Sequence, residues 1–193
     1  MAGTLVHFAG AETGGLEEVE TVSGGAAADS AQARSGSYSY KLSGNATVQA
    51  AVPDNSAEVN AGIAGFGFRW NVNLIPTSDI DFFRAGNAAG TALHLRLRIK
   101  AVTGDVKVVD ATGTEVATIT APFAQNTWYY VEVYAPRSDS ATAEVWINGT
   151  SVASVSGDFL NGAGGQTFGL WGSLVTGEDI WIDDFYKHNN PAA

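Results

Sequence analysis

The chain has 193 residues, of which 45% are hydrophobic, and carries a formal net charge of -10 at pH 7. This length can bury one sizeable core, so we expect one domain. The excess of acidic residues repels phosphate backbones and argues against general nucleic-acid binding. Because the sequence contains no cysteine, disulfides and thiolate metal sites are excluded.

No segment of the sequence resembles a targeting or membrane signal. The first eight residues lack the basic segment and the apolar run of a signal peptide. No later run approaches the roughly 20 apolar residues of a membrane span. We therefore expect a soluble protein that is made in a cytoplasm and does not bind a membrane.

Short alternating or β-branched runs follow one another along the whole chain, separated by Gly, Asn, Asp, Ser and Pro. This pattern is typical of an all-β sandwich or barrel, and helical periodicity is nearly absent. The predicted strands cover residues 4–8, 17–22, 37–43, 47–52, 61–72, 80–85, 92–101, 106–110, 115–120, 127–135, 142–147, 151–156, 166–171 and 180–187.

Within the fifth predicted strand, Phe66, Phe68 and Trp70 alternate with smaller or polar residues. Since successive side chains of a strand point to opposite faces, this alternation predicts that the three aromatic rings pack in the core.

The alternation is clearest over residues 93–100, where four aliphatic residues alternate with His94, Arg96, Arg98 and Lys100. The pattern predicts a half-buried strand with one apolar face and one locally basic outer face.

The Asn148-Gly149 pair is the strongest hairpin signal in the sequence. A type I′ turn needs positive φ at both central residues, and Asn followed by Gly adopts this conformation at low cost. We therefore expect a tight turn between the strands that flank this pair.

Several segments, in this order, resemble the concanavalin A-like lectin/glucanase (LamG-like) jelly roll, in particular the versions found in bacteriophage structural proteins and carbohydrate-binding modules. They are FAGAETG at 8–14, RSGSYSYKL at 34–42, WYYVEVY at 128–134, VWING at 145–149 and WIDDF at 181–185. The resemblance implies an all-β, two-sheet antiparallel jelly-roll sandwich with its first and last strands adjacent. We expect a single jelly-roll domain over residues 1–187 and a short C-terminal tail at 188–193.

The resemblance also implies a function, although one jelly roll supports many. Our main hypothesis is a non-enzymatic virion structural protein, made in the host cytoplasm and bound at the virion surface as a capsid decoration or accessory protein. Its partners would be the major capsid protein or other virion proteins, and a second copy of the chain in a homo-oligomer. The alternative is a carbohydrate-binding module or adhesin that recognises a cell-surface polysaccharide.

Related carbohydrate-binding modules often hold a structural calcium ion where the chain ends meet. By that resemblance Glu12, Asp183 and Asp184 are candidate Ca²⁺ ligands, because carboxylates and backbone carbonyls supply the oxygens that this ion requires. In the alternative interpretation, Asp183 and Asp184 accept hydrogen bonds from loop amides or from Tyr and Trp groups, and Glu12 is solvated. No cofactor is required in either case.

A candidate binding face combines the basic strand with two aromatic strands. If Val131, Val133, Val145 and Ile147 face inward, the residues between them face outward. The face would serve a glycan or a protein partner, or the charges would only pair across a solvated sheet. Its candidate residues are His94, Arg96, Arg98, Lys100, Tyr130, Glu132, Tyr134, Glu144 and Trp146.

The sequence lacks the Glu-x-Asp-x-(x)-Glu run with which related glucanases hydrolyse sugars. Asp79 and Asp81 fall on one strand face, but nothing beside them marks a general acid. The three histidines are scattered without zinc-binding spacing. We therefore expect no enzymatic activity.

Overall fold

The computed structural model describes residues 5–19, 21–50, 61–70, 78–87, 92–161, 167–171 and 178–189. In these ranges the chain forms strands joined by turns and loops, and none of it is a helix that could cross a membrane. The strands are β1 (Leu5–Ala9), β2 (Thr21–Asp29), β3 (Ser39–Ala50), β4 (Ala61–Trp70), β5 (Ile80–Gly86), β6 (Leu93–Ile99), β7 (Val106–Val109), β8 (Glu115–Ile119), β9 (Tyr129–Pro136), β10 (Ala141–Ile147), β11 (Thr150–Gly157), β12 (Thr167–Trp171) and β13 (Asp179–Asn189).

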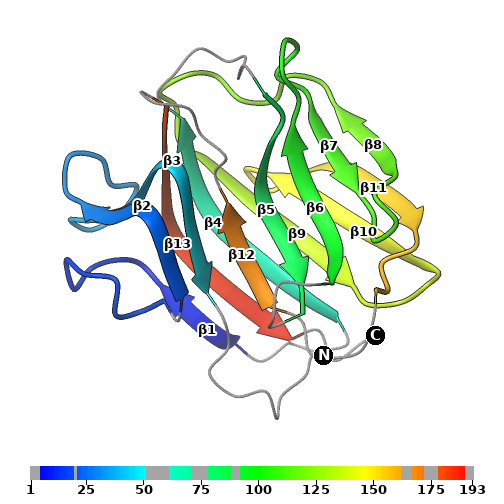
Figure 1. Ribbon diagram of the computed structural model, residues 1–193, viewed down its shortest axis with the longest axis horizontal. Helices are drawn as coiled ribbons and strands as arrows, with labels where there is room; N and C mark the ends of the chain where they lie inside the picture. The colour runs from blue at the N-terminus through cyan, green and yellow to red at the C-terminus, as the bar shows by residue number, and fades with distance from the viewer. Residues whose placement is uncertain are drawn as a thin grey trace.

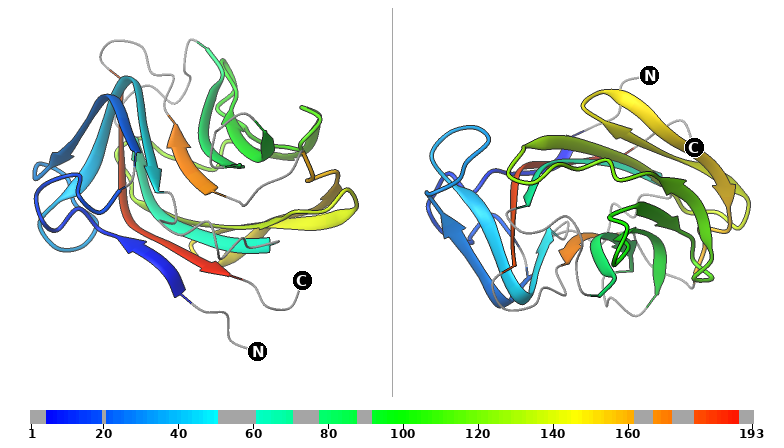
Figure 2. Two further views of the ribbon diagram at one scale, coloured as in Figure 1. Left: turned by 60° about the horizontal axis from the view of Figure 1, so that its bottom comes forward. Right: turned by 90° about the horizontal axis from the view of Figure 1, so that it is seen from above.

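The strands follow one hydrogen-bonded path in the order β11-β10-β9-β4-β13-β3-β12-β5-β6-β7-β8, with β1 on β13 and β2 on β3. The path turns at β3, because β13 pairs with the first part of this strand and β12 with its last part. The path therefore folds over into two facing layers (Figures 1 and 2). We call β11, β10, β9, β4, β13 and β1 the first layer, and β12, β5, β6, β7 and β8 the second layer.

This arrangement confirms the predicted all-β, two-sheet antiparallel jelly-roll sandwich. Every strand pair in the described part of the chain is antiparallel, and β1 lies against β13. The first and last strands are therefore adjacent, as the family resemblance implied.

The core lies between the layers and is rich in aromatic rings. Phe66 and Phe68 of β4 are fully buried, and Trp70 is 4% exposed, as the alternation predicted. Phe66 stacks on Phe83 of β5 with ring centroids 5.6 Å apart, and Phe68 contacts Phe82 at 5.0 Å. These contacts join the two layers, and burial of each ring stabilises the fold by about 2 kcal/mol.

Two predicted strand boundaries are wrong. Residues 16–19 form turns, because the Glu18 carboxylate accepts hydrogen bonds from the backbone N–H groups of Gly10 and Ala11 and from the Tyr40 hydroxyl. The two strands expected at 37–43 and 47–52 are one strand, β3, because β2 pairs with it on both sides of residue 45. Residues 4, 20, 51–52, 71–72 and 166 of the predicted strands lie outside the described ranges.

The predicted tail also begins too early. β13 continues to Asn189, and its residue His188 is paired with Ile63 of β4 and with Leu5 of β1. His188 therefore belongs to the sheet, because it has a neighbouring strand on each side.

The predicted turn at Asn148-Gly149 is confirmed, with φ of 51° and 75° at the two residues. Asn148 also ties this hairpin to β9. Its side-chain oxygen accepts the N–H of Tyr130, and its own N–H donates to the carbonyl of Tyr130, both at 2.8 Å.

Candidate functional site

A row of residues crosses five strands on the outer face of the first layer. Trp146 of β10 pairs with Glu132 of β9, Glu132 with Gly65 of β4, Gly65 with Tyr186 of β13, and Tyr186 with Phe8 of β1. Because paired residues of neighbouring strands share a face, their side chains project to the same side of the sheet. Four inter-strand spacings separate Trp146 from Phe8, about 19 Å in all.

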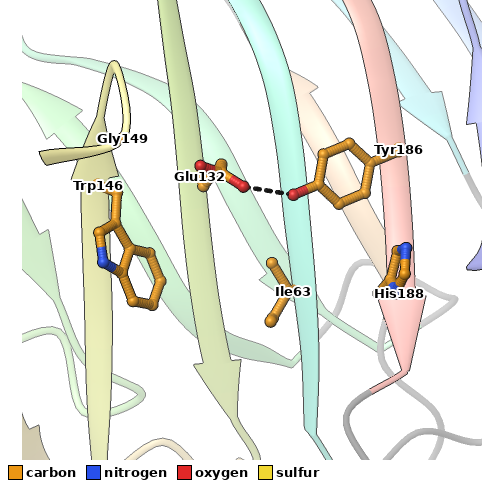
Figure 3. Close-up of a pocket in the computed structure, with 6 residues that line it drawn as sticks. All are labelled: Ile63, Glu132, Trp146, Gly149, Tyr186 and His188. Carbon is orange, nitrogen blue, oxygen red and sulfur yellow. Dashed lines mark hydrogen bonds between the residues drawn. The ribbon is translucent and has the colours of Figure 1, made fainter. Parts of the chain in front are cut away.

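The centre of the row depends on Gly65. A Cβ atom at this position would lie 2.2 Å from Cε1 of Tyr186, so the tyrosine ring occupies the space above the glycine. From there the Tyr186 hydroxyl reaches across β4 and donates a hydrogen bond of 2.6 Å to Oε1 of Glu132 (Figure 3). The absence of a side chain at Gly65 therefore allows a contact between strands that are not neighbours.

A surface hollow of about 430 Å³ lies along this row. Trp146 and Tyr186 stand on opposite sides of it, with Glu132 and Ile63 between them (Figure 3). The His188 ring meets Tyr186 edge to face, with centroids 5.5 Å apart. In the described part of the chain, the hollow is lined by Ile63, Glu132, Trp146, Gly149, Tyr186 and His188.

A second tyrosine supports the first. Tyr130 stacks on Tyr186 with ring centroids 6.3 Å apart, and the Arg34 guanidinium lies 4.6 Å from the centroid of Tyr130. Burial raises the pKa of Tyr130 to about 12, and burial together with the hydrogen bond to Glu132 raises the pKa of Tyr186. Both hydroxyls therefore stay protonated at neutral pH, so the Tyr186 hydroxyl can act as a hydrogen-bond donor.

The structure brings together part of the predicted binding face. Tyr130, Glu132 and Tyr134 alternate with buried valines on β9, and Glu144 pairs with Tyr134 just as Trp146 pairs with Glu132. These five residues share the outer face of the first layer.

The basic residues of the predicted face lie elsewhere. β6 belongs to the second layer, and its inward residues Leu95 and Leu97 are fully buried against the core. Arg96, Arg98 and Lys100 therefore point away from the core on the opposite side of the sandwich. The expectation of one surface carrying both sets is wrong, because alternation fixes the face of a strand but not its layer.

His94 is a separate correction. We expected it on the outer face, but it is 0% exposed, and its Nε2 lies 3.1 Å from the carbonyl oxygen of Asn161. Burial lowers the pKa of His94, which favours the neutral ring. Asn161, in the segment that follows β11, therefore contacts this histidine, and His94 does not contribute to an exposed binding face.

The three candidate calcium ligands all contact the loop at residues 34–37. Asp183 accepts hydrogen bonds from the backbone N–H groups of Arg34 and Ser35, and Asp184 pairs with the Arg34 guanidinium at 2.5 Å. Glu12 accepts the N–H of Ser37 at 3.0 Å.

These carboxylates do not fit a calcium site, because their oxygens face hydrogen-bond donors. The described residues contain no group of three or more acidic or histidine side chains placed to hold a metal ion. The arrangement agrees with the alternative interpretation, in which Asp183 accepts loop amides, and we assign no ion to this loop.

Sequence reasoning missed several residues of the site, namely Phe8, Ile63, Gly65, Tyr186 and His188. Phe8, the last residue but one of β1, is 57% exposed. The family resemblance could have predicted part of this set, because it placed the first and last strands side by side and therefore Phe8 near Tyr186.

Comparison with known proteins gives a fold but no family. No protein-family model matches the chain, and no curated protein matches it either. Among solved structures, the chain is similar to an endo-β-1,4-glucuronan lyase of the fungus Trichoderma reesei, with a TM-score of 0.70 and 12% identity over 97% of this chain and 96% of that one.

Two further similar structures also carry carbohydrate-related names. Domain 4 of an extracellular arabinanase from Geobacillus stearothermophilus, solved with arabinotriose, has a TM-score of 0.68 and 14% identity over 98% of this chain and 94% of that one. A carbohydrate esterase of the Shiga toxin-encoding bacteriophage phi24B has a TM-score of 0.65 and 16% identity over 98% and 100%.

These structures overturn the expectation that the chain is not an enzyme. The expectation considered only hydrolysis by paired carboxylates and zinc chemistry, whereas a lyase and an esterase share the fold. Elimination and acyl transfer need neither a Glu-x-Asp pair nor zinc, so the missing motifs do not exclude catalysis. At these identities the likeness shows the fold alone: this chain has a β-sandwich that carbohydrate-binding and carbohydrate-active proteins also use.

Proposed function

We propose that the protein binds a carbohydrate chain in the hollow of the first layer, along the row from Trp146 to Phe8. The observation that carries the proposal is the Tyr186 ring, which lies over Gly65 with its hydroxyl fixed on Glu132. The ring and the carboxylate are held in place before any ligand arrives, so little ordering entropy is lost on binding.

The hollow offers the two kinds of contact that a sugar needs. Trp146 and Tyr186 provide aromatic surface for the apolar C–H faces of the rings. Glu132 and His188 provide polar atoms for the hydroxyl groups at the edges of the rings. An apolar lining with a few convergent polar groups is typical of a small-molecule site. The carbohydrate ligand in the similar arabinanase domain supports the same class of ligand.

The charges around the hollow favour a neutral glycan over an acidic one. Of the six lining residues in the described part of the chain, Glu132 is a carboxylate and His188 is the one that can become a cation. Arg34 lies on the neighbouring Tyr130, but its guanidinium is paired with Asp184. Among the residues that the structure describes, a uronic acid would therefore meet a carboxylate in the hollow and no free cation to balance it.

The test is a binding screen with neutral polysaccharides, arabinan and β-1,4-glucan among them, followed by calorimetry on any polymer that binds. We expect Trp146→Ala to weaken binding about tenfold or more, since loss of a central aromatic contact commonly has this effect. The control is Leu160→Ala, because Leu160 is an exposed apolar residue that does not line the hollow. Equal affinity of the two variants would contradict the proposal.

Uronate and acetylated polymers test for catalysis. Because elimination needs a carboxyl group beside the proton that is removed, lyase activity is tested on a uronate polymer and would appear as unsaturated ends, while esterase activity would appear as acid released from acetylated polymers. The raised pKa of Tyr186 favours hydrogen-bond donation by its hydroxyl over proton abstraction at neutral pH. We therefore propose ligand binding as the role of this tyrosine.

The virion role stays a prediction from the family resemblance, together with its capsid partners and a homo-oligomer. One of the similar structures comes from a bacteriophage, and that protein is a carbohydrate esterase. Quantitative mass spectrometry of purified particles tests this role. A fixed ratio to the major capsid protein would support it, and absence from particles would contradict it.

A further inference from the structure

Three arginines surround one carboxylate on the outer face of the second layer. Arg98 of β6 donates from Nε to Oδ1 of Asp81 at 2.6 Å, and Arg84 of β5 donates from Nη2 to Oδ2 at 3.0 Å. The third, Arg96, has its Nη1 3.8 Å from the same Oδ2. Asp81 is only 6% exposed, while its three partners remain partly accessible.

A β-bulge gathers these residues on one face. Asp81 pairs with Arg98 and Phe83 with Leu97, so Phe82 is an extra residue in β5. Phe82 and Phe83 therefore both reach the core, where each contacts an aromatic ring of β4. Asp81 and Arg84, three positions apart, consequently share the outer face.

The described residues of this face have more positive than negative charge. Lys107 of β7 pairs with Arg98 and hydrogen-bonds Thr118, so it adds a fourth cation beside the cluster. Glu115 binds Lys100 at the edge of the sheet. Asp81 therefore lies among four cations, with Asp79, Asp110 and Glu115 at the border of the cluster, in a protein whose overall charge is strongly negative.

Arg96 is the least satisfied member of the cluster. Its Nε is buried and lacks a hydrogen-bond partner, and burial, opposed by the attraction of Asp81, lowers its pKa. Its side chain is 17% exposed, and a Cβ atom at Gly113 would lie 3.5 Å from its Nη2. An incoming anion would meet guanidinium groups that already share one acceptor.

We infer that the guanidinium groups of Arg84, Arg96 and Arg98 form a second ligand site, which binds the carboxylate groups of an acidic polysaccharide. A guanidinium presents parallel N–H donors that match the two oxygens of a carboxylate. The cations lie on three adjacent strands, β5, β6 and β7, so they can contact successive acidic units of an extended chain. The choice of a polysaccharide rests on the proposed function, but the site is separate from the hollow.

The experiment uses polygalacturonate as the probe, with binding to the whole protein measured by calorimetry at low and at moderate salt. We expect binding that weakens as salt is added, because the contacts are between charges. Arg96→Ala should weaken it about tenfold. The matched control is Arg69→Ala, since Arg69 lies on β4 of the first layer and donates to the carbonyl of Asn126.

A second variant separates binding from stability. Asp81→Asn removes the competing carboxylate, so we expect tighter binding of polygalacturonate even if the melting temperature falls. A purely structural ion cluster would lower the melting temperature without any polymer binding, and this outcome would overturn the inference. Equal loss in Arg96→Ala and Arg69→Ala would overturn it too, as would equal binding of dextran sulfate, which carries no carboxylate.

Trp146→Ala distinguishes failure of this inference from failure of the proposed function. Because the hollow is on the other layer, this variant should bind polygalacturonate as the unaltered protein does. Loss of uronate binding in Trp146→Ala would place the acidic ligand in the hollow and contradict a second site.

Discussion

The two outer faces of the sandwich show how one alternating pattern produces two different surfaces. The first layer exposes aromatic rings around Glu132, and the second exposes guanidinium groups around Asp81. Each face depends on one departure from regular strand structure: Gly65, which admits the Tyr186 ring, and the bulge at Phe82, which places Asp81 beside Arg84. The local irregularities therefore decide which side chains meet, while the regular pairing only decides which face they occupy.

A buried cation in the first layer gives the largest expected effect. Lys187 of β13 is 1% exposed, and burial lowers its pKa to about 8 from the ordinary value of 10.5. Between these two values the unfolded chain binds a proton that the folded protein does not, so the free energy of unfolding should rise with pH. The rise corresponds to at most about 3 kcal/mol.

Urea denaturation at pH 7, 8, 9 and 10 measures this rise, and Lys187→Met should remove it. Below about pH 8 Lys187 is charged in the folded protein, and the full cost of burying this charge lowers the free energy of unfolding. Lys187→Met should therefore also be more stable than the original protein at pH 7. Above about pH 10 the raised pKa values of Tyr130 and Tyr186 act in the opposite direction, because the folded state then binds the extra protons. A profile that is flat from pH 8 to 10 would contradict the prediction.

The carboxylate of the second layer gives the next effect. Asp81→Ala leaves three guanidinium groups facing one another, and we expect a loss of about 2 kcal/mol in the free energy of unfolding, a reduced value because the arginines are partly solvated. Added salt should restore part of this loss by screening the repulsion. The matched control is Asp79→Ala, since Asp79 binds Lys100 at an exposed position and should contribute a few tenths of a kcal/mol. If both variants lose the same free energy of unfolding, the arginine cluster does not stabilise the protein more than a single exposed ion pair does.

The glycine of the first layer is tested by Gly65→Ala. The new Cβ would lie 2.2 Å from the Tyr186 ring, so the ring must move and its hydrogen bond to Glu132 should be lost. We expect a cost of about 1 kcal/mol in stability and a clear loss of neutral-glycan binding. Gly10→Ala is the control, because a Cβ there meets its neighbours at 3.6 Å or more. Near-ultraviolet circular dichroism reports the movement of the tyrosine.

Much of the fold could be predicted because it depends on local alternation. The strand at residues 93–100, the core rings Phe66 and Phe68 and the turn at Asn148-Gly149 each follow from neighbouring residues alone. The layer that each strand joins depends on pairing between distant segments, and the sequence pattern carries no such information. For this reason the prediction that Arg96 and Trp146 lie on the same face was wrong.

A β-bulge in β13 explains why the sequence pattern did not predict Tyr186 as a residue of the site. Ile180 and Ile182 point inward, and a regular strand would turn Tyr186 inward as well. The register shifts between Asp183 and Tyr186, and Asp184 has φ of 49°, so Phe185 is buried and Tyr186 faces the hollow. Nothing in the alternation of this segment places the bulge, because the positive φ falls on an aspartate instead of a glycine.

The smallest expected effect comes from removing the charge of Glu132 while keeping an oxygen acceptor. In Glu132→Gln the Tyr186 hydroxyl still has an acceptor, so stability should change by less than about 1 kcal/mol. The pKa of Tyr186 should fall, since the negative charge of Glu132 contributes to its rise, and ultraviolet titration of the tyrosines measures this shift. If the hollow prefers neutral glycans because of this charge, the variant should bind uronates there more readily than the unaltered protein, with neutral glycans little affected. If the variant prefers neutral glycans over uronates as strongly as the unaltered protein does, the shape of the hollow, and not the charge of Glu132, causes this preference.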